Sequence, residues 1–114
     1  MSRGFDSLRT SADFAQLSKG GIRHNARFFS VVVYKRPEPS PFNTLRLGIV
    51  ASKRSYKLAV DRNRAKRRIR SMIQKFSIDY NLSGFDILVI ARRGFVECEY
   101  SKLDHAMRKI ISRI

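Results

Sequence analysis

The sequence predicts a two-layer α/β (α+β) sandwich in which helices cover one mixed sheet of about four strands. Segments rich in β-branched and aromatic residues indicate strands at 27–35, 44–52 and 84–92. Helical periodicity of apolar residues appears at 58–76 and again toward the C-terminus. A chain of 114 residues can build one modest core, so we expect a single domain over residues 1–114.

The first half of the chain indicates a short helix and then two strands. "SADFAQLSKGG" offers Ser11 as an N-cap, places Phe14 and Leu17 three apart on an inner face, and ends in two glycines. The strand at 27–35 is followed by "RPEPSPF", whose three prolines favour an exposed loop. After so short a connection, we expect the strand at 44–52 to pair antiparallel with the preceding strand.

The second half indicates a long helix, a strand and a final helix. In the long helix one apolar stripe comprises Leu58, Ala65, Ile69, Met72, Ile73 and Phe76. The continuous apolar run "GFDILVIAR" is typical of a central strand that is covered on both faces. Ser101 and Asp104 form a candidate capping pair for the final helix. Its apolar stripe comprises Leu103, Ala106, Met107, Ile110, Ile111 and Ile114.

The charge of the chain restricts its partners. It carries 24 Lys and Arg against 9 Asp and Glu, a net charge of +15 that favours an anionic partner, nucleic acid first. Because 43% of the residues are apolar, this charge belongs to a folded surface rather than a disordered tail. No apolar run approaches the roughly 18 to 20 residues of a spanning helix, so we expect no membrane partner. The lone Cys98 and the absence of a signal-type start favour the cytoplasm.

The segment "DRNRAKRRIR" places six cations behind a single Asp61, and the next acidic residue is Asp79. This segment is either a solvated helix face or a surface that binds an anionic partner. A solvated face usually carries both signs of charge, so the second interpretation is the stronger one. Guanidinium groups suit phosphate oxygens, and an asparagine adds a donor and an acceptor for a sugar or base edge. On a helical wheel, Arg62 and Arg68 lie near the apolar stripe, so we expect their stems to pack and their head groups to reach out.

Three stretches, "LRLGIVASKR", "AVDRNRAKRRIR" and "GFDILVIARRG", together resemble the protein component of bacterial ribonuclease P. The resemblance runs from about Leu8 to Ile111 and implies a left-handed βαβ crossover in the sandwich. It also implies a partner and a role. Such a subunit binds the catalytic RNA and the 5′ leader of precursor tRNA, and assists leader removal by an RNA-containing holoenzyme that requires magnesium. No cofactor is expected on the protein itself.

The resemblance implies two groups of site residues. The RNA-binding group is Lys53, Arg54, Arg62, Asn63, Arg64, Lys66, Arg67, Arg68 and Arg70. The second group lines a cleft between the first helix and the sheet that contacts the leader. It comprises Phe14 and Phe29, while Ser18 and Val32 stand where some members carry further aromatics. Phe14 has the spacing of a core residue as well, so packing is an equal alternative.

We expect no catalytic side chain in this chain. Apart from Glu97 and Glu99 the carboxylates are scattered singly, and His24 and His105 have no apparent partner. A structural RNA-binding protein, such as a small ribosomal protein, fits the charge and size equally well, and the Arg-Asn-Arg match favours the ribonuclease P subunit. We expect no DNA partner, because the basic helix lacks a helix-turn-helix partner and dimer-forming heptads.

Overall fold

The computed structural model describes residues 5–7, 15, 17, 19–36, 45–51, 56–82 and 84–114. The elements are β1 (Phe5–Ser7), β2 (Ile22–Asn25), β3 (Phe29–Lys35), β4 (Leu45–Val50), α2 (Ala59–Asp79), β5 (Phe85–Ala91) and α3 (Tyr100–Ile111). Of the predicted first helix, Ala15, Leu17, Lys19 and Gly20 are described, and all four are helical. Ser11 and Phe14 lie outside the described residues.

The strands form one mixed sheet in the order β1-β4-β5-β3-β2. β4 runs parallel to β1 and β5, whereas β3 is antiparallel to β5 and β2. The predicted antiparallel pairing of 27–35 with 44–52 is therefore wrong, because β5 lies between these strands. The return through α2 brings β5 beside β4 in parallel, and its apolar run takes the centre of the sheet. The left-handed sense of this β4-α2-β5 crossover stays a prediction of the resemblance.

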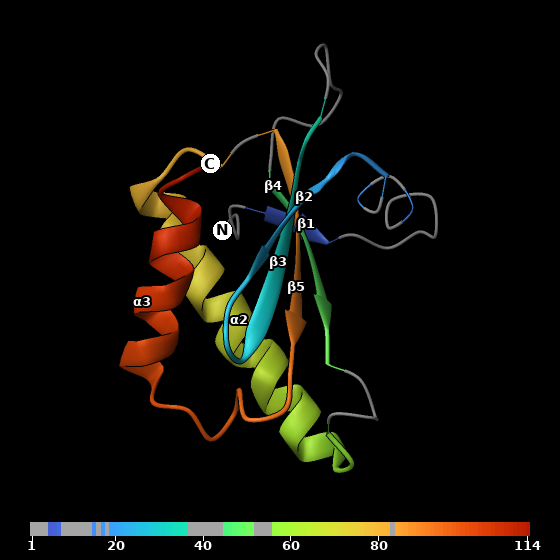
Figure 1. The fold of residues 1–114 in the computed structure, drawn as a ribbon, viewed down its shortest axis with the longest axis vertical. Helices are drawn as coiled ribbons and strands as arrows, with labels where there is room; N and C mark the ends of the chain where they lie inside the picture. Colours follow the sequence, from blue (N-terminus) through green and yellow to red (C-terminus); the bar gives the residue numbers. More distant parts are fainter. Residues whose placement is uncertain are drawn as a thin grey trace.

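Both helices α2 and α3 pack on one face of the sheet (Figure 1). Alternate residues of β5 point to this face, where Ile87, Val89 and Ala91 are buried in the main core. On the other face Leu17 of the first helix packs with Val32, while the intervening β5 residues Leu88 and Ile90 are only half-buried. β5 is thus covered on both faces, as expected, but less completely on the second face, which contains a hollow.

Several local predictions are corrected. Leu58 lies just before α2 and is 61% exposed, so it does not belong to the core stripe. Helix α3 begins at Tyr100 with Glu99 at the N-cap, so Ser101 is already inside the helix and forms no capping pair. Strands β1 and β2 were not predicted, because the first has three residues and the second, "IRHN", lacks an alternating apolar pattern.

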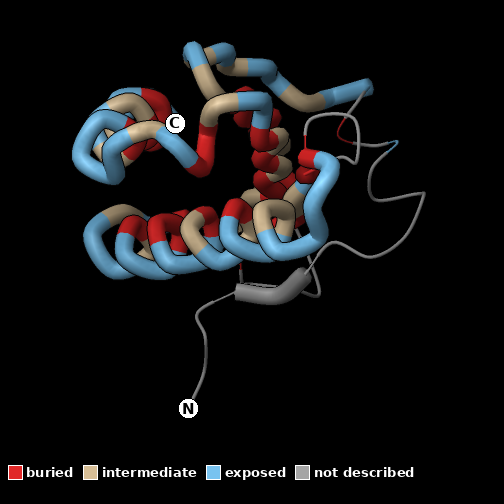
Figure 2. The backbone as a smooth tube through the Cα atoms, turned by 90° about the horizontal axis from the view of Figure 1, so that it is seen from below, coloured by how far each residue is buried: buried red, intermediate tan, exposed pale blue. Residues whose placement is uncertain are grey.

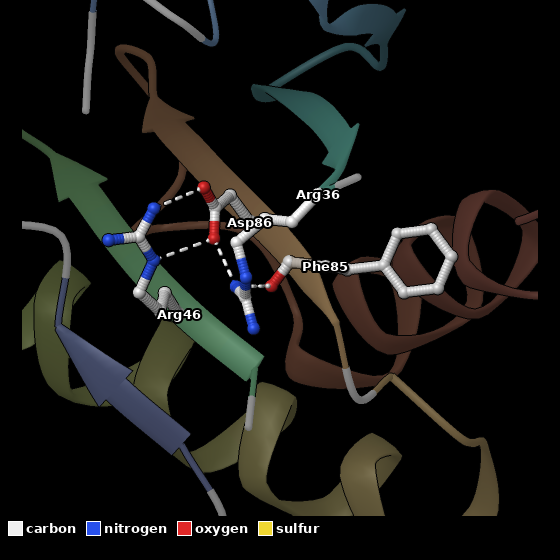
Figure 3. A network of polar contacts seen from close by, with 4 residues as sticks. All are labelled: Arg36, Arg46, Phe85 and Asp86. Atoms are coloured by element: carbon white, nitrogen blue, oxygen red, sulfur yellow. Dashed lines mark hydrogen bonds and ion pairs between the residues drawn. The ribbon is translucent and has the colours of Figure 1, made fainter. Parts of the chain in front are cut away.

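A buried charge cluster joins β3, β4 and β5 (Figure 3). The carboxylate of Asp86 is fully buried and accepts two hydrogen bonds from Arg46, of 2.8 Å from Nε and 2.7 Å from Nη2. Arg36 binds the same carboxylate from the other side and donates to the Phe85 carbonyl at 3.1 Å. We expected Arg36 to begin an exposed loop, but it is only 7% exposed because this ion pair draws it inward. The remainder of that loop is outside the described residues.

Candidate nucleic-acid interface

Helix α2 separates apolar and cationic side chains on opposite sides, as predicted. Its buried side comprises Ala65, Ile69, Met72, Ile73 and Phe76. Its outward side carries an exposed group that we call the basic crest, namely Asn63, Arg64, Arg67 and Arg70. Figure 2 shows this division along α2, with red on the inner edge of the coil and pale blue on the outer edge.

The positive charge of the basic crest is not compensated locally. Among the described residues, the ion pairs join other arginines and lysines to Asp79, Asp86 and Asp104, and none includes a crest arginine. The neighbouring Lys66 is half-buried and also has no ion pair with a described residue. Such a line of unpaired guanidinium groups on a rigid helix matches the charge and donor geometry needed to bind successive phosphates.

Arg62 and Arg68 bind the protein instead of extending away from it. Nη1 of Arg62 donates to the Tyr56 carbonyl at 2.9 Å. Nη1 of Arg68 donates to the carbonyls of Val96 at 2.9 Å and Cys98 at 3.3 Å. The expectation that both head groups reach out is therefore corrected, because each donates a hydrogen bond to a backbone carbonyl of the protein. These two arginines hold α2 against neighbouring segments and so orient the basic crest. The predicted Lys53 and Arg54 lie outside the described residues.

Tyr56 fixes the chain just before α2. Its side chain is 5% exposed, and its hydroxyl donates to the carbonyl of Arg92 at the end of β5. Burial raises the pKa of Tyr56 above its ordinary value of 10.0, because the phenolate would lose its hydration. Ionisation would also remove the proton that this hydrogen bond requires.

We expect Tyr56→Phe to lower the free energy of unfolding by about 1 kcal/mol near pH 8, where the hydroxyl is a donor. A raised folded-state pKa contributes stability that is present below the unfolded value of 10.0 and is lost as the pH rises above it. The difference between wild type and variant should therefore shrink at about pH 11. Urea unfolding at both pH values measures it, and a constant difference would contradict the assignment.

A hollow of about 250 Å³ lies on the sheet face opposite α2. Its lining residues are Leu17, Gly21, Arg23, Val32, Leu88 and Ile90. The first helix approaches the sheet closely at Gly21, where a Cβ atom would lie 2.6 Å from Cγ1 of Val32. Val32, which the resemblance places in the leader cleft, does line this hollow.

Phe29 does not line this hollow, which corrects the prediction. It is 1% exposed in the main core, and its ring meets the ring of Phe95 edge-on, with 6.0 Å between centroids. Side chains alternate between faces along a strand, so Phe29 points with Val31 toward the helices, whereas Val32 points to the hollow. Phe14 lies outside the described residues.

A polar chain beside the hollow was not predicted from the sequence. Asn25 Oδ1 accepts hydrogen bonds from Arg23 Nε at 3.1 Å and from Ser30 Oγ at 2.8 Å. Nη2 of Arg92 in turn donates to Ser30 Oγ at 2.6 Å. These hydrogen bonds join β2, β3 and the residue that follows β5, and they hold two exposed arginines, Arg23 and Arg92, on the face of the hollow. The polar chain could not be found from the sequence because β2 was not recognised as a strand.

The described residues contain no group of three or more His, Cys, Asp or Glu side chains that could hold a metal ion. Within the same part of the chain, no helix has the length and apolar character needed to cross a membrane.

Comparison with known proteins extends over nearly the whole chain. A family model described as Ribonuclease P matches residues 3–114. The ribonuclease P protein component of Rickettsia akari is 34% identical over 113 residues, covering 94% of this chain and 95% of that protein. The RNase P protein from Thermotoga maritima aligns with a TM-score of 0.78 at 26% identity, over 96% of this chain and 97% of that one. The Staphylococcus aureus RNase P protein gives 0.75 at 26% identity, over 93% and 92%.

Proposed function

Because the chain belongs to the ribonuclease P protein family, we propose that its basic crest binds the catalytic RNA subunit and its hollow takes the 5′ leader of precursor tRNA. The observation that carries the first half is the line of unpaired arginines on α2. The three guanidinium groups of the basic crest lie on a helix that Arg62 and Arg68 hold in place, so their positions are fixed. A structured polyanion with regularly spaced phosphates fits the basic crest.

In this proposal the RNA subunit performs the cleavage and the protein positions the substrate. Phosphoryl chemistry depends mainly on metal ions and positioning, both of which an RNA can supply. Magnesium would act in the RNA-containing holoenzyme, where it neutralises phosphate charge. The protein would reduce repulsion between two polyanions and hold the leader, and we place this activity in the cytoplasm.

The proposal for the leader rests on the hollow and its neighbouring charges. Its floor is formed by aliphatic side chains of β3 and β5, and Arg23 stands at its lining. An extended single strand could lay a base or sugar on the aliphatic floor while its phosphates contact Arg23 and Arg92. This assignment replaces Phe29 by residues of the opposite sheet face.

Reconstitution tests the proposed function. The purified chain alone should cut no precursor tRNA, whereas its addition to the catalytic RNA of the same organism should accelerate leader removal at low magnesium. The rate is measured from the appearance of the mature 5′ end. Cleavage at that position by the RNA-free chain, or no effect of the chain on the RNA-catalysed rate, would overturn the proposal.

The corrected position of Phe29 gives a distinct prediction. Phe29→Leu keeps most of the apolar volume and should lower the free energy of unfolding by about 1 kcal/mol. It should leave the ratio of precursor to mature tRNA affinity unchanged in the holoenzyme, because Phe29 points to the helices. Arg23→Ala should instead lower the ratio of precursor to mature tRNA affinity and leave the free energy of unfolding nearly unchanged. Arg23 is exposed and lines the hollow. Both affinities and the unfolding free energy are measured for each variant, and a changed ratio for Phe29→Leu would restore it to the cleft.

A further inference from the structure

Two large apolar side chains are exposed at the start of α2. Leu58 is 61% exposed and Val60 is 58% exposed, and neither belongs to a buried cluster. Val60 precedes Arg64 by four residues and Arg67 by seven, so it continues the line of the basic crest. In Figure 1 this lime-green start of α2 lies at the lower end of the molecule, away from the centre of the sheet. Val60 therefore adds an exposed apolar side chain to the line of the basic crest, and the exposed Leu58 lies two residues before it at the N-cap of α2.

The charge around this apolar surface decides which partner fits it. If a second copy of the chain bound here through the same surface, the unpaired arginines of the two crests would come together. Electrostatic repulsion opposes this arrangement. A membrane surface would need a broad apolar stripe, but the outward residues that follow Val60 are polar or cationic, from Asn63 to Gln74. RNA meets both requirements, because its phosphates pair with arginine and its unstacked bases present apolar faces.

We propose that Leu58 and Val60 pack on the face of an unstacked base of the catalytic RNA, next to phosphates held by Arg64 and Arg67. The inference rests on the proposed function and adds an apolar component to it. Contacts between cations and phosphates weaken as salt rises, because binding releases counterions. Burial of an apolar side chain against a base releases no counterions, so it adds no counterion-release contribution to the slope of log K against log salt.

The chain contains a matched control for these two residues. Ile78 is 82% exposed and lies about five turns, roughly 27 Å, further along the same line of α2. It follows Lys75 and precedes Asp79, and the basic crest ends before it. Ile78 thus resembles Val60 in shape, exposure and direction and differs from it in lacking neighbouring unpaired arginines.

The experiment compares Leu58→Ser/Val60→Ser with Ile78→Ser in binding to the catalytic RNA over a range of salt concentrations. The double variant should bind about five- to tenfold more weakly at every concentration, with an unchanged slope of log K against log salt. Ile78→Ser should bind like the wild type. Serine is a favoured N-cap at the position of Leu58, so a weakened α2 cannot explain the loss.

Base-specific chemical probing of the same complexes locates the contact. At least one unpaired base that the wild type protects from dimethyl sulfate should become reactive with the double variant and stay protected with Ile78→Ser. Equal weakening by Ile78→Ser, a changed salt slope in the double variant, or unaltered base protection would each overturn the inference. Wild-type self-association that the double variant abolishes would assign the surface to a second copy. Failure of the wild type to bind the RNA at all would instead refute the proposed function.

Discussion

Replacing Arg64, Arg67 and Arg70 with alanine is expected to flatten the salt dependence of binding to the catalytic RNA by about two to three units of log K per log salt. Each arginine that neutralises a phosphate releases somewhat less than one counterion, and the three losses add because the side chains act separately. All three are exposed and outside the apolar stripe of α2, so the circular dichroism spectrum should remain that of the wild type. Filter binding or fluorescence anisotropy across a salt series measures the slope.

A variant of equal charge provides the control. Lys102, Lys109 and Arg113 are exposed in or just after α3, and their replacement by alanine also removes three positive charges. If the crest forms the interface, this control should change the slope far less than the crest variant does. An unaltered slope in a folded crest variant would show that α2 is not part of the RNA interface. Equal slopes in both variants would show that the slope depends on the net charge of the protein and not on the crest.

The second large effect concerns stability. Asp86→Ala should lower the free energy of unfolding by about 3 to 5 kcal/mol, because it removes the buried carboxylate that Arg36 and Arg46 both bind. Arg36 and Arg46 are 7% and 14% exposed, so neither can recover full hydration without disturbing the strands. In a domain of this size such a loss lowers the melting temperature by roughly 15 °C or more. Calorimetry and urea unfolding measure the change.

Asp104 is the matched control for Asp86. It also contacts two cations, Lys75 at 3.0 Å and Arg108 at 3.6 Å, but these partners are 48% and 40% exposed. Water screens such a pair, so Asp104→Ala should cost about 1 kcal/mol or less. Equal losses from the two substitutions would show that burial of the Asp86 carboxylate does not govern its contribution.

Features set by local periodicity were predictable from the sequence. The apolar stripe of α2 from Ala65 to Phe76 and the central position of β5 follow from side chains that are close in the chain, and both are confirmed. Pairing of distant segments is not predictable in the same way: the short connection favours pairing of β3 with β4, whereas the partners of β3 are β5 and β2. Alternation along β3 separates Phe29 from Val32, but it cannot say which of the two faces the helices will cover.

Charged residues show the same limit. Arg36 follows a strand and precedes three prolines, a context that favours exposure, and only the fold brings it to Asp86 fifty residues later. Within the basic segment the spacing correctly separated Arg64, Arg67 and Arg70 from the core. It could not foresee that Arg62 and Arg68 bind carbonyls, because the acceptor of Arg68 belongs to a loop after β5.

The sheet lies between the two surfaces that we propose to bind anions, the basic crest and the hollow. The basic crest faces away from the sheet on the α2 side, and the hollow opens on the opposite face. Ligands at these surfaces have a helix layer and the sheet between them, a thickness comparable to or greater than the Debye length of about 10 Å at 0.1 M salt. If both surfaces bind as proposed, the two ligands would contact different side chains and could be bound at the same time.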